Sequence, residues 1–193
     1  MNNKKTEIIF LLDRSGSMAG LESDTIGGFN SFIERQCSLD GETLLTTVLF
    51  DDRYEVLWDG VNAKDVRLTK REYYVRGGTA LLDAVGKTIV DVDRRLERTK
   101  KDYLPDNVIF VITTDGMENA SREFSAEQVK RMIQERQDKW EVVFLGANID
   151  AVEEAEHIGI RRDRAYQFEA SSKGVEVMYD MVNEVVMENR KRK

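Results

Sequence analysis

The amino-acid sequence predicts a three-layer α/β sandwich of the doubly wound, Rossmann-like class, with a mainly parallel sheet between two layers of helices. Short continuous apolar runs of strand length alternate with longer stretches in which apolar residues recur every three or four positions. Continuous runs are typical of strands buried on both faces, and the longer spacing is typical of helices with one buried face. In addition, one pair of strand-like runs is separated only by Asp51 and Asp52, which is too short for a crossover between parallel strands.

Runs rich in Ile, Val, Leu and Phe predict the central strands, which are residues 7–12, 44–50, 108–113 and 141–145. Residues 53–58 follow the second run after the two aspartates, so we predict that these two strands pair as an antiparallel hairpin. The sheet is therefore expected to be parallel except for one reversed edge strand. Because strands and helices alternate along the chain, the helices are expected on both faces of the sheet.

Helical stripes of apolar residues separate the predicted strands. The stripes are Ile26, Phe29, Ile33 and Cys37, then Leu82, Val85, Ile89, Val92 and Leu96, and finally Val175, Met178, Met181, Val182 and Val185. Ser125 with Gln128 forms a capping-box pattern, which predicts that a helix begins at Ser125. Asp150 with Glu153 repeats that pattern before another short apolar stripe. We interpret Cys37 as a small buried hydrophobe, because a sole cysteine cannot form an intramolecular disulfide.

The composition narrows the class of protein. With 193 residues, the chain is expected to form a single domain over residues 1–193. Its 41% hydrophobic and 34% charged residues supply a core and a soluble surface, and they exclude global disorder. The formal net charge of −7 disfavours nonspecific electrostatic binding to nucleic acid. The apolar run at residues 8–12 is too short for a secretory signal and no run approaches a membrane span, so a cytoplasmic location is expected.

Oxygen-bearing side chains follow the first predicted strand directly. Asp13, Ser15 and Ser17 stand at alternate positions, and Gly16 allows a tight backbone path between the serines. Open α/β sheets bind ligands at the carboxyl ends of their strands. Hydroxyl and carboxylate oxygens are ligands that suit a hard divalent cation. The D-x-S-x-S pattern is weak alone, and its position after a buried strand strengthens the prediction of a metal site.

Two further segments carry oxygen donors. Gly77 and Gly78 lead to Thr79, which places a hydroxyl just before the helix expected from about Ala80. Taken alone, this segment is better explained as a turn in which Thr79 is the N-cap of the helix. Asp115 and Gly116 follow the strand at residues 108–113, and such a pair is ordinary turn chemistry when considered by itself. The specific signal is the combination of all three segments in this order and at wide spacing.

The combined pattern resembles the von Willebrand factor type A (vWA) domain with a complete metal-ion-dependent adhesion site (MIDAS). The resemblance extends over residues 6–189, and residues 13–18 and 113–116 look like those of stand-alone bacterial members. It implies hydroxyl ligands from Ser15, Ser17 and Thr79, and carboxylates from Asp13 and Asp115 that often act through bridging water. It also implies that the strands carrying the two aspartates are neighbours in the sheet.

The resemblance further implies the ion, the ligand and the absence of catalysis. The expected ion is Mg²⁺, with Mn²⁺ or Ca²⁺ as alternatives, and the expected ligand is an Asp or Glu carboxylate of a partner protein. Neutral hydroxyls around the ion would leave much of its positive field directed at the open coordination position. The chain is therefore expected to be a protein-interaction module and not an enzyme.

Several loop residues are candidates for partner selection on their position alone. They are Met18, Leu21, Glu118, Asn119 and residues 72–76. Within the last group, Tyr73 and Tyr74 are residue types that commonly anchor interfaces. An equally good interpretation is that one of the two tyrosines lies in the core and the other is a surface ring.

An enzymatic alternative is a Mg²⁺-dependent phosphotransferase or phosphatase that resembles the haloacid dehalogenases. Asp13 would then be the nucleophile, Thr113 or Thr114 would bind phosphate, and Asp115 would hold magnesium. That layout usually has a second carboxylate two residues after the nucleophile. Ser15 stands at this position, and its hydroxyl ionises too reluctantly for acid–base catalysis.

Two other functions are disfavoured by the sequence. His157 is the only histidine, it lies far from both motifs along the chain, and no G-x-S-x-G pattern supports serine hydrolysis. Association with RNA, as in some relatives of this fold, is suggested only by the basic residues 190–193. Such a short cationic end is usually a solvated tail that also suits the helix dipole.

Overall fold

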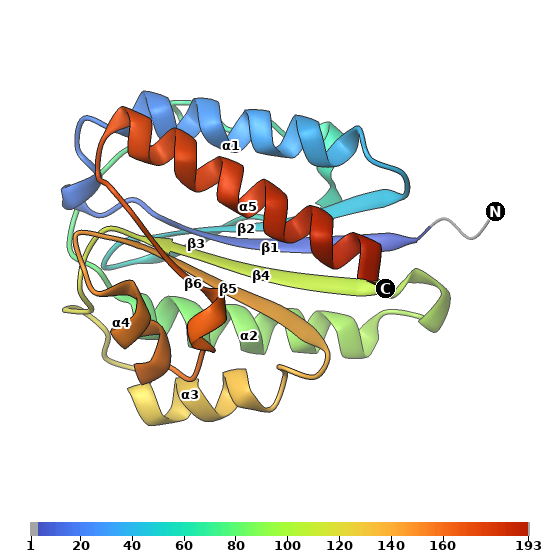
Figure 1. The fold of residues 1–193 in the computed structure, drawn as a ribbon. Helices are drawn as coiled ribbons and strands as arrows, with labels where there is room; N and C mark the ends of the chain where they lie inside the picture. The colour runs from blue at the N-terminus through green and yellow to red at the C-terminus, as the bar shows by residue number, and fades with distance from the viewer. Residues whose placement is uncertain (1–3, 193) are drawn as a thin grey trace.

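The computed structural model describes residues 4–192, so residues 1–3 and 193 of the expected domain and basic tail lie outside the described part. It contains a six-stranded sheet between two layers of helices (Figure 1). The strands are β1 (Lys5–Asp13), β2 (Glu42–Phe50), β3 (Tyr54–Asn62), β4 (Asn107–Thr114), β5 (Trp140–Ala147) and β6 (Ala165–Phe168). Their order across the sheet is β3-β2-β1-β4-β5-β6, with only β3 antiparallel to its neighbour. The predicted fold class and the reversed edge strand are confirmed.

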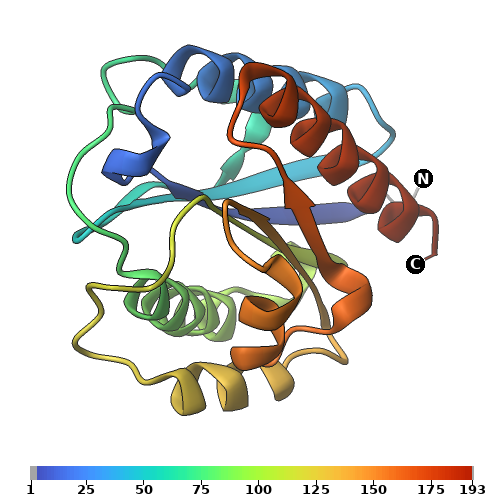
Figure 2. The same cartoon turned by 60° about the vertical axis from the view of Figure 1, so that its left-hand side comes forward.

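Helices cover both faces of the sheet. On one face lie α1 (Glu22–Cys37) and α5 (Ser172–Arg192), and on the other lie α2 (Leu81–Arg98), α3 (Ala126–Gln134) and α4 (Ala151–His157) (Figures 1 and 2). The short 3₁₀ helices are η1 (Gly16–Met18), η2 (Ala63–Asp65), η3 (Lys101–Tyr103) and η4 (Arg162–Arg164). No helix within residues 4–192 is long and apolar enough to cross a membrane.

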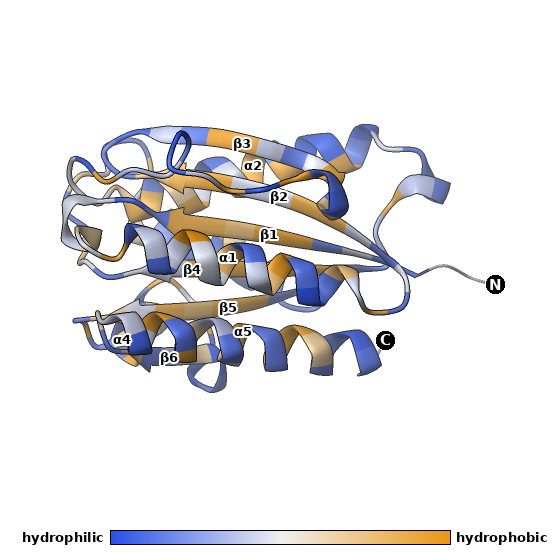
Figure 3. Ribbon diagram, turned by 90° about the horizontal axis from the view of Figure 1, so that it is seen from above, coloured by the Kyte–Doolittle hydropathy of each residue, from blue (hydrophilic) through white to orange (hydrophobic). Residues whose placement is uncertain are grey.

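The central strands are buried on both faces, as their continuous apolar sequences require. In β1, Phe10 belongs to the core beneath α1 and α5, whereas Ile9 and Leu11 belong to the core on the opposite face. The ring of Phe10 meets the rings of Phe29 and Tyr179, at centroid distances of 5.4 and 6.1 Å. Figure 3 shows apolar colour along the central strands and mixed colour on the helices. Burial of each such side chain contributes about 1.5–3 kcal/mol.

The predicted helix starts agree with the structure. Ser125 is the N-cap of α3, and both hydrogen bonds of its capping box with Gln128 are present. Asp150 is the N-cap of α4 and accepts hydrogen bonds from two amides of the first turn. Cys37 ends α1 half-buried against the core, so it is less enclosed than we expected. His157, the only histidine, is the exposed last residue of α4.

The sheet order brings the two acidic motifs together. Strand β1 pairs in parallel with β4, and their register places Leu12 beside Thr113. Asp13 and Asp115 therefore leave neighbouring strands at the same edge of the sheet, as the resemblance implied. This edge lies at the end of the sheet away from both termini (Figure 1). It is the place where open α/β sheets bind ligands.

Candidate metal centre

Asp13 is the last residue of β1, and its side chain is buried. Its Oδ1 accepts a hydrogen bond of 2.7 Å from the Ser15 amide, and its Oδ2 accepts one of 2.7 Å from the Thr114 hydroxyl. Burial raises the pKa of Asp13 to about 6, although both hydrogen bonds oppose this rise. The charge of Asp115 adds to the rise. Asp13 is therefore held firmly between β1 and β4, in surroundings that would favour a nearby cation.

Ser15, Ser17 and Asp115 form a continuous chain of hydrogen bonds. The Ser15 and Ser17 hydroxyl oxygens lie 3.0 Å apart, and the Ser17 hydroxyl donates to Asp115 Oδ1 at 2.5 Å. The other carboxylate oxygen, Asp115 Oδ2, is buried and has no hydrogen-bond partner within residues 4–192. Burial also raises the pKa of Asp115. An unpaired buried carboxylate oxygen is costly, so this atom points to a missing positive partner.

Thr79 is buried just before α2, but its hydroxyl does not cap that helix. The N-cap is Ala80, which has no side-chain cap, and the amides of Leu82 and Asp83 are instead bound by the side chains of Glu118 and Ser121, both at 2.9 Å. The alternative that Thr79 is a helix N-cap is therefore wrong. The Thr79 hydroxyl is left available for another role.

Asn119 and Gly116 place Thr79 beside the other oxygen donors. The Asn119 side-chain oxygen accepts from the Thr79 amide at 2.9 Å, and the Asn119 amide donates to the Thr79 carbonyl at 3.0 Å. A Cβ atom added to Gly116 would lie 3.0 Å from Thr79 Oγ1 and 3.4 Å from Ser17 Oγ. These two hydroxyls therefore flank the backbone that follows Asp115. The structure thus gathers oxygen donors from three separate segments of the chain.

The loop that follows β1 contains a buried arginine, Arg14. Arg14 has no exposed side-chain surface; its Nε lies 2.9 Å from Asp51 Oδ2, and one of its terminal nitrogens lies 2.7 Å from Glu55. Arg76 binds the same Asp51 oxygen at 2.7 Å. Burial opposes ionisation of Asp51, but hydrogen bonds from Arg76, the Arg53 amide and Arg14 hold its pKa below the ordinary value. The sequence gives no sign of this network, because an arginine between Asp13 and Ser15 in a D-x-S-x-S loop is normally expected on the surface.

The candidate loop residues divide into buried and exposed groups. Tyr73 is buried and donates to the Asp13 carbonyl, whereas Tyr74 is 45% exposed and its ring lies against the guanidinium groups of Arg14 and Arg76. The interpretation of one core tyrosine and one surface ring is therefore confirmed. Met18 and Leu21 are buried in the core beside α1, so their suggested role as partner contacts is wrong.

The donor set suits an oxygen-preferring divalent cation. Two carboxylates and three hydroxyls surround the end of β1, with no thiol or imidazole among them. No cluster of three or more His, Cys, Asp or Glu side chains that could hold a metal is found in the described part of the chain. The mixed hydroxyl and carboxylate set is of the kind that hard ions such as Mg²⁺ accept. The unpaired Asp115 Oδ2 provides an independent reason to expect an ion there.

Comparison with solved structures shows the fold but not the function. No family model matches the chain, and no curated protein matches its sequence. Proximal thread matrix protein 1 from the mussel byssus, in a structure "with zinc occupied MIDAS motif", has a TM-score of 0.66 and 17% identity over 95% of this chain and 46% of that one. Pilus adhesin SpaC from Lactobacillus rhamnosus GG, in an open conformation, has a TM-score of 0.70 and 14% identity over 98% and 31%.

The ArnB paralog VWA2 from Sulfolobus acidocaldarius gives a TM-score of 0.56 and 14% identity, covering 92% of this chain and 44% of that one. This chain spans less than half the length of each of these three structures. At such identities the similarity establishes the vWA-type, Rossmann-like fold. The roles of individual residues have to be argued from the site itself.

Proposed function

We propose that this chain is a metal-ion-dependent protein-interaction module. Ser15, Ser17 and Thr79 would hold one divalent cation through their hydroxyls, while Asp13 and Asp115 would balance its charge. An Asp or Glu carboxylate of a partner protein would complete the coordination. The observation that carries the proposal is the buried, unpaired Asp115 Oδ2 beside hydroxyls from separate segments. The zinc-occupied MIDAS motif of one structural neighbour supports it.

The electrostatics of the site favour an ion. Burial raises the pKa of both Asp13 and Asp115, and the charge of Asp115 adds to the rise at Asp13. A divalent cation reverses this effect, because it stabilises the ionised forms. The donors in direct contact with the ion would be neutral hydroxyls, so much of its positive field would stay directed at the open position for an incoming carboxylate. We propose Mg²⁺ as the resident ion, with Mn²⁺ and Ca²⁺ as alternatives.

The same geometry argues for binding without catalysis. Both oxygens of Asp13 are occupied by hydrogen bonds, from the Ser15 amide and the Thr114 hydroxyl, and its side chain is buried. Such a carboxylate is poorly placed to attack phosphorus in the manner of a haloacid dehalogenase. Ser15, at the position expected for a general acid, is hydrogen-bonded to Ser17. We therefore favour the interaction module over the phosphotransferase.

An RNA-associated role has little support from the C-terminal end. The Arg190 guanidinium donates to the Thr43 hydroxyl at 2.6 Å, so this cation lies against the protein instead of extending from it. The chain also carries a net charge of −7. A bacterial source and a cytoplasmic location, both expected from the sequence, are part of this proposal.

Calorimetric titration of chelator-treated protein with Mg²⁺ and with Mn²⁺ tests the proposal. We expect one ion per chain for the unmodified protein and none for Asp13→Ala or Ser15→Ala. Asp65→Asn is the matched control, because Asp65 is an exposed aspartate in η2. Added acetate should increase the Mg²⁺ affinity, because ion and carboxylate bind cooperatively and reciprocally. Failure to bind either ion, both without and with acetate, would contradict the proposal.

A further inference from the structure

The loop between β4 and α3 borders the candidate metal centre. It begins with Asp115 and Gly116, and the Gly116 backbone lies beside the hydroxyls of Thr79 and Ser17. A Cβ atom on Gly116 would lie 3.0 Å from Thr79 Oγ1. Because consecutive Cα atoms are about 3.8 Å apart, the Cα atom of the next residue, Met117, lies within about 8 Å of that hydroxyl. Met117 therefore stands at the rim of the metal centre.

Two polar side chains hold the middle of this loop in place. The Glu118 carboxylate accepts hydrogen bonds of 2.9 Å from the Leu82 amide in α2 and of 2.7 Å from the Ser121 amide. The Asn119 side-chain oxygen accepts from the Thr79 amide at 2.9 Å. Glu118 and Asn119 were candidates for partner contact on their position alone, and both are already bound within the protein.

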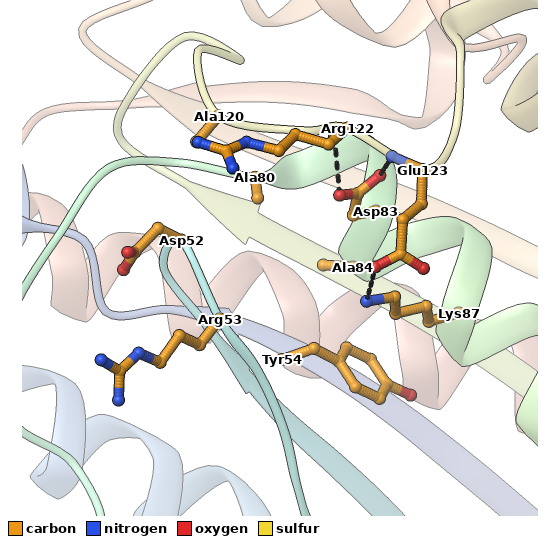
Figure 4. Close-up of a pocket in the computed structure, with 10 residues that line it drawn as sticks. All are labelled: Asp52, Arg53, Tyr54, Ala80, Asp83, Ala84, Lys87, Ala120, Arg122 and Glu123. Carbon is orange, nitrogen blue, oxygen red and sulfur yellow. Dashed lines mark hydrogen bonds and ion pairs between the residues drawn. The ribbon is translucent and has the colours of Figure 1, made fainter.

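The end of the loop is tied to α2 as well (Figure 4). The Asp83 carboxylate in the first turn of α2 accepts hydrogen bonds of 2.9 Å from the amides of Arg122 and Glu123. A Cβ atom on Gly86 would lie 2.4 Å from the Phe124 ring, so the loop also packs directly on the helix. The loop is thus fixed along its length, and little of its backbone has to be ordered when a ligand binds.

Met117 is a large apolar side chain that this fixed loop holds in water. It is 64% exposed and is not among the residues of either hydrophobic core in the described part of the chain. Tyr74 is also exposed on a loop at this edge of the sheet, but its ring lies against the guanidinium groups of Arg14 and Arg76. Single exposed apolar residues are common on proteins. Met117 differs from such residues because it lies on an anchored loop beside the metal centre.

We propose that Met117 determines specificity by packing against an apolar side chain of the partner segment whose carboxylate binds the metal ion. The inference rests on the proposed function and specifies its partner. An extended segment advances about 3.3 Å per residue, so a side chain one or two positions from the carboxylate spans the distance between the ion and Met117. Methionine suits this contact, because its unbranched, polarisable side chain packs against apolar groups of different shapes. The partner segment is therefore an acidic residue with a large apolar residue close to it in sequence.

Synthetic peptides test this inference. Each capped peptide carries one glutamate and one test residue, which is either leucine or the polar asparagine of similar size, one or two positions before or after the glutamate. Glycine fills the other positions. We expect Mg²⁺-loaded protein to bind the best leucine peptide about fivefold more tightly than its asparagine counterpart. Met117→Gln keeps the length of the side chain but makes it polar, so it should lose this preference while keeping its Mg²⁺ affinity. Met117→Leu should retain the preference.

Nuclear magnetic resonance of protein labelled with ¹³C at its methionine methyl groups provides a second readout. The signal of Met117 is the one that is missing from the spectrum of Met117→Leu. This signal should shift when the leucine peptide is added to Mg²⁺-loaded protein, because the apolar side chain would then lie against the methyl group. The same peptide added in chelator should leave the signal unchanged, since the carboxylate would have no ion to bind.

The matched control is Tyr103→Gln. Tyr103 is 66% exposed in η3, which precedes β4 and so lies at the other edge of the sheet from the metal centre. This control should keep the preference for the leucine peptide. Equal binding of leucine and asparagine peptides at every position, or a preference that survives in Met117→Gln, would overturn the inference alone. Failure of the unmodified protein to bind Mg²⁺, or binding of the peptides that does not need Mg²⁺, would instead overturn the proposed function and the inference with it.

Discussion

The Tyr73 hydroxyl donates a 2.7 Å hydrogen bond to the backbone carbonyl of Asp13. Tyr73 is buried in the core, and Asp13 is the residue at which β1 ends and the candidate metal loop begins. This bond therefore ties the starting point of the loop to the packed interior. Buried carbonyl groups that lose their donor destabilise a protein, so the bond also serves the fold.

Tyr73→Phe should lower both the stability and the ion affinity of the protein. Removing the hydroxyl leaves the Asp13 carbonyl without this donor, at a cost of about 1–2 kcal/mol in the free energy of unfolding. Urea denaturation and calorimetric titration with Mg²⁺ measure the two effects. Tyr74→Phe is the control, because Tyr74 is exposed and its hydroxyl accepts only a 3.3 Å bond from Arg76. Equal behaviour of the two variants would show that the bond to Asp13 has no such role.

Asn119→Ala should weaken Mg²⁺ binding more than it weakens the fold. The lost side-chain oxygen accepts from the Thr79 amide and so positions the Thr79 hydroxyl. We expect about a tenfold loss of affinity, which is typical of groups that orient a metal ligand. The accompanying loss of stability should be only about 1 kcal/mol. Asn119→Asp retains an acceptor oxygen and should recover most of the affinity; if it binds as poorly as Asn119→Ala, positioning by this bond is excluded.

The stability of the metal-free protein should depend on the protonation of Asp13. Its pKa is about 6 in the folded chain, above the ordinary 3.8. The folded chain therefore binds this proton more tightly, so the contribution of Asp13 to stability is complete at low pH and is lost as the pH rises through about 6. Chemical denaturation in chelator across this range measures the slope. Asp13→Asn should remove this part of the pH dependence, and an unchanged slope would refute the assignment.

Magnesium binding should show the opposite dependence on pH. The ion needs the ionised carboxylate, so its affinity should rise as the pH increases toward about 6 and change less above that value. Calorimetry in buffers of different ionisation enthalpy would detect the proton released by Asp13 near this pH. Binding that is independent of pH and releases no proton would indicate that Asp13 is already ionised in the metal-free protein.

Two adjacent glycines of α1 should respond in opposite directions to alanine. A Cβ atom on Gly27 meets nothing within 4 Å, so Gly27→Ala should stabilise the helix by about 0.5–1 kcal/mol. A Cβ atom on Gly28 would lie 2.2 Å from the ring of Tyr179, which is buried in α5. Gly28→Ala should therefore destabilise the protein by about 1–3 kcal/mol, because α1 and α5 would have to separate. Thermal melting compares the pair, and similar shifts for both would show that the helices are not in close contact at Gly28.

Much of the fold could be predicted because local patterns agree with the final packing. The apolar run at residues 7–12 is buried on both faces, and the capping box at Ser125 forms as its sequence indicates. Strand β6 could not be predicted, since its four residues form no apolar run and it depends on pairing with β5. A segment that is held in place by distant parts of the chain is thus the hardest to predict from sequence.

The sequence predicted the oxygen donors of the candidate site, but it did not predict the residues that hold these donors in place. The D-x-S-x-S pattern and its partners Thr79 and Asp115 identified the oxygen donors, and sheet order explains why they converge. Taken alone, the segment around Thr79 is better explained as a helix cap, because the sequence cannot show that Glu118 and Ser121 bind the first amides of α2. The sequence also contains no indication of the buried ion pair between Arg14 and Asp51, which depends on the hairpin turn.

The contact between Ser17 and Asp115 joins residues that are 98 positions apart in the chain. An ion bound there would act as a removable cross-link between the two halves of the sequence, present only when both halves are folded together. By mass action, a free ion concentration 100 times the dissociation constant adds about 2.7 kcal/mol to the free energy of unfolding. The concentration of free ion would then determine the fraction of chains that can bind a partner. It would also determine how fast chains without a partner are degraded by proteases.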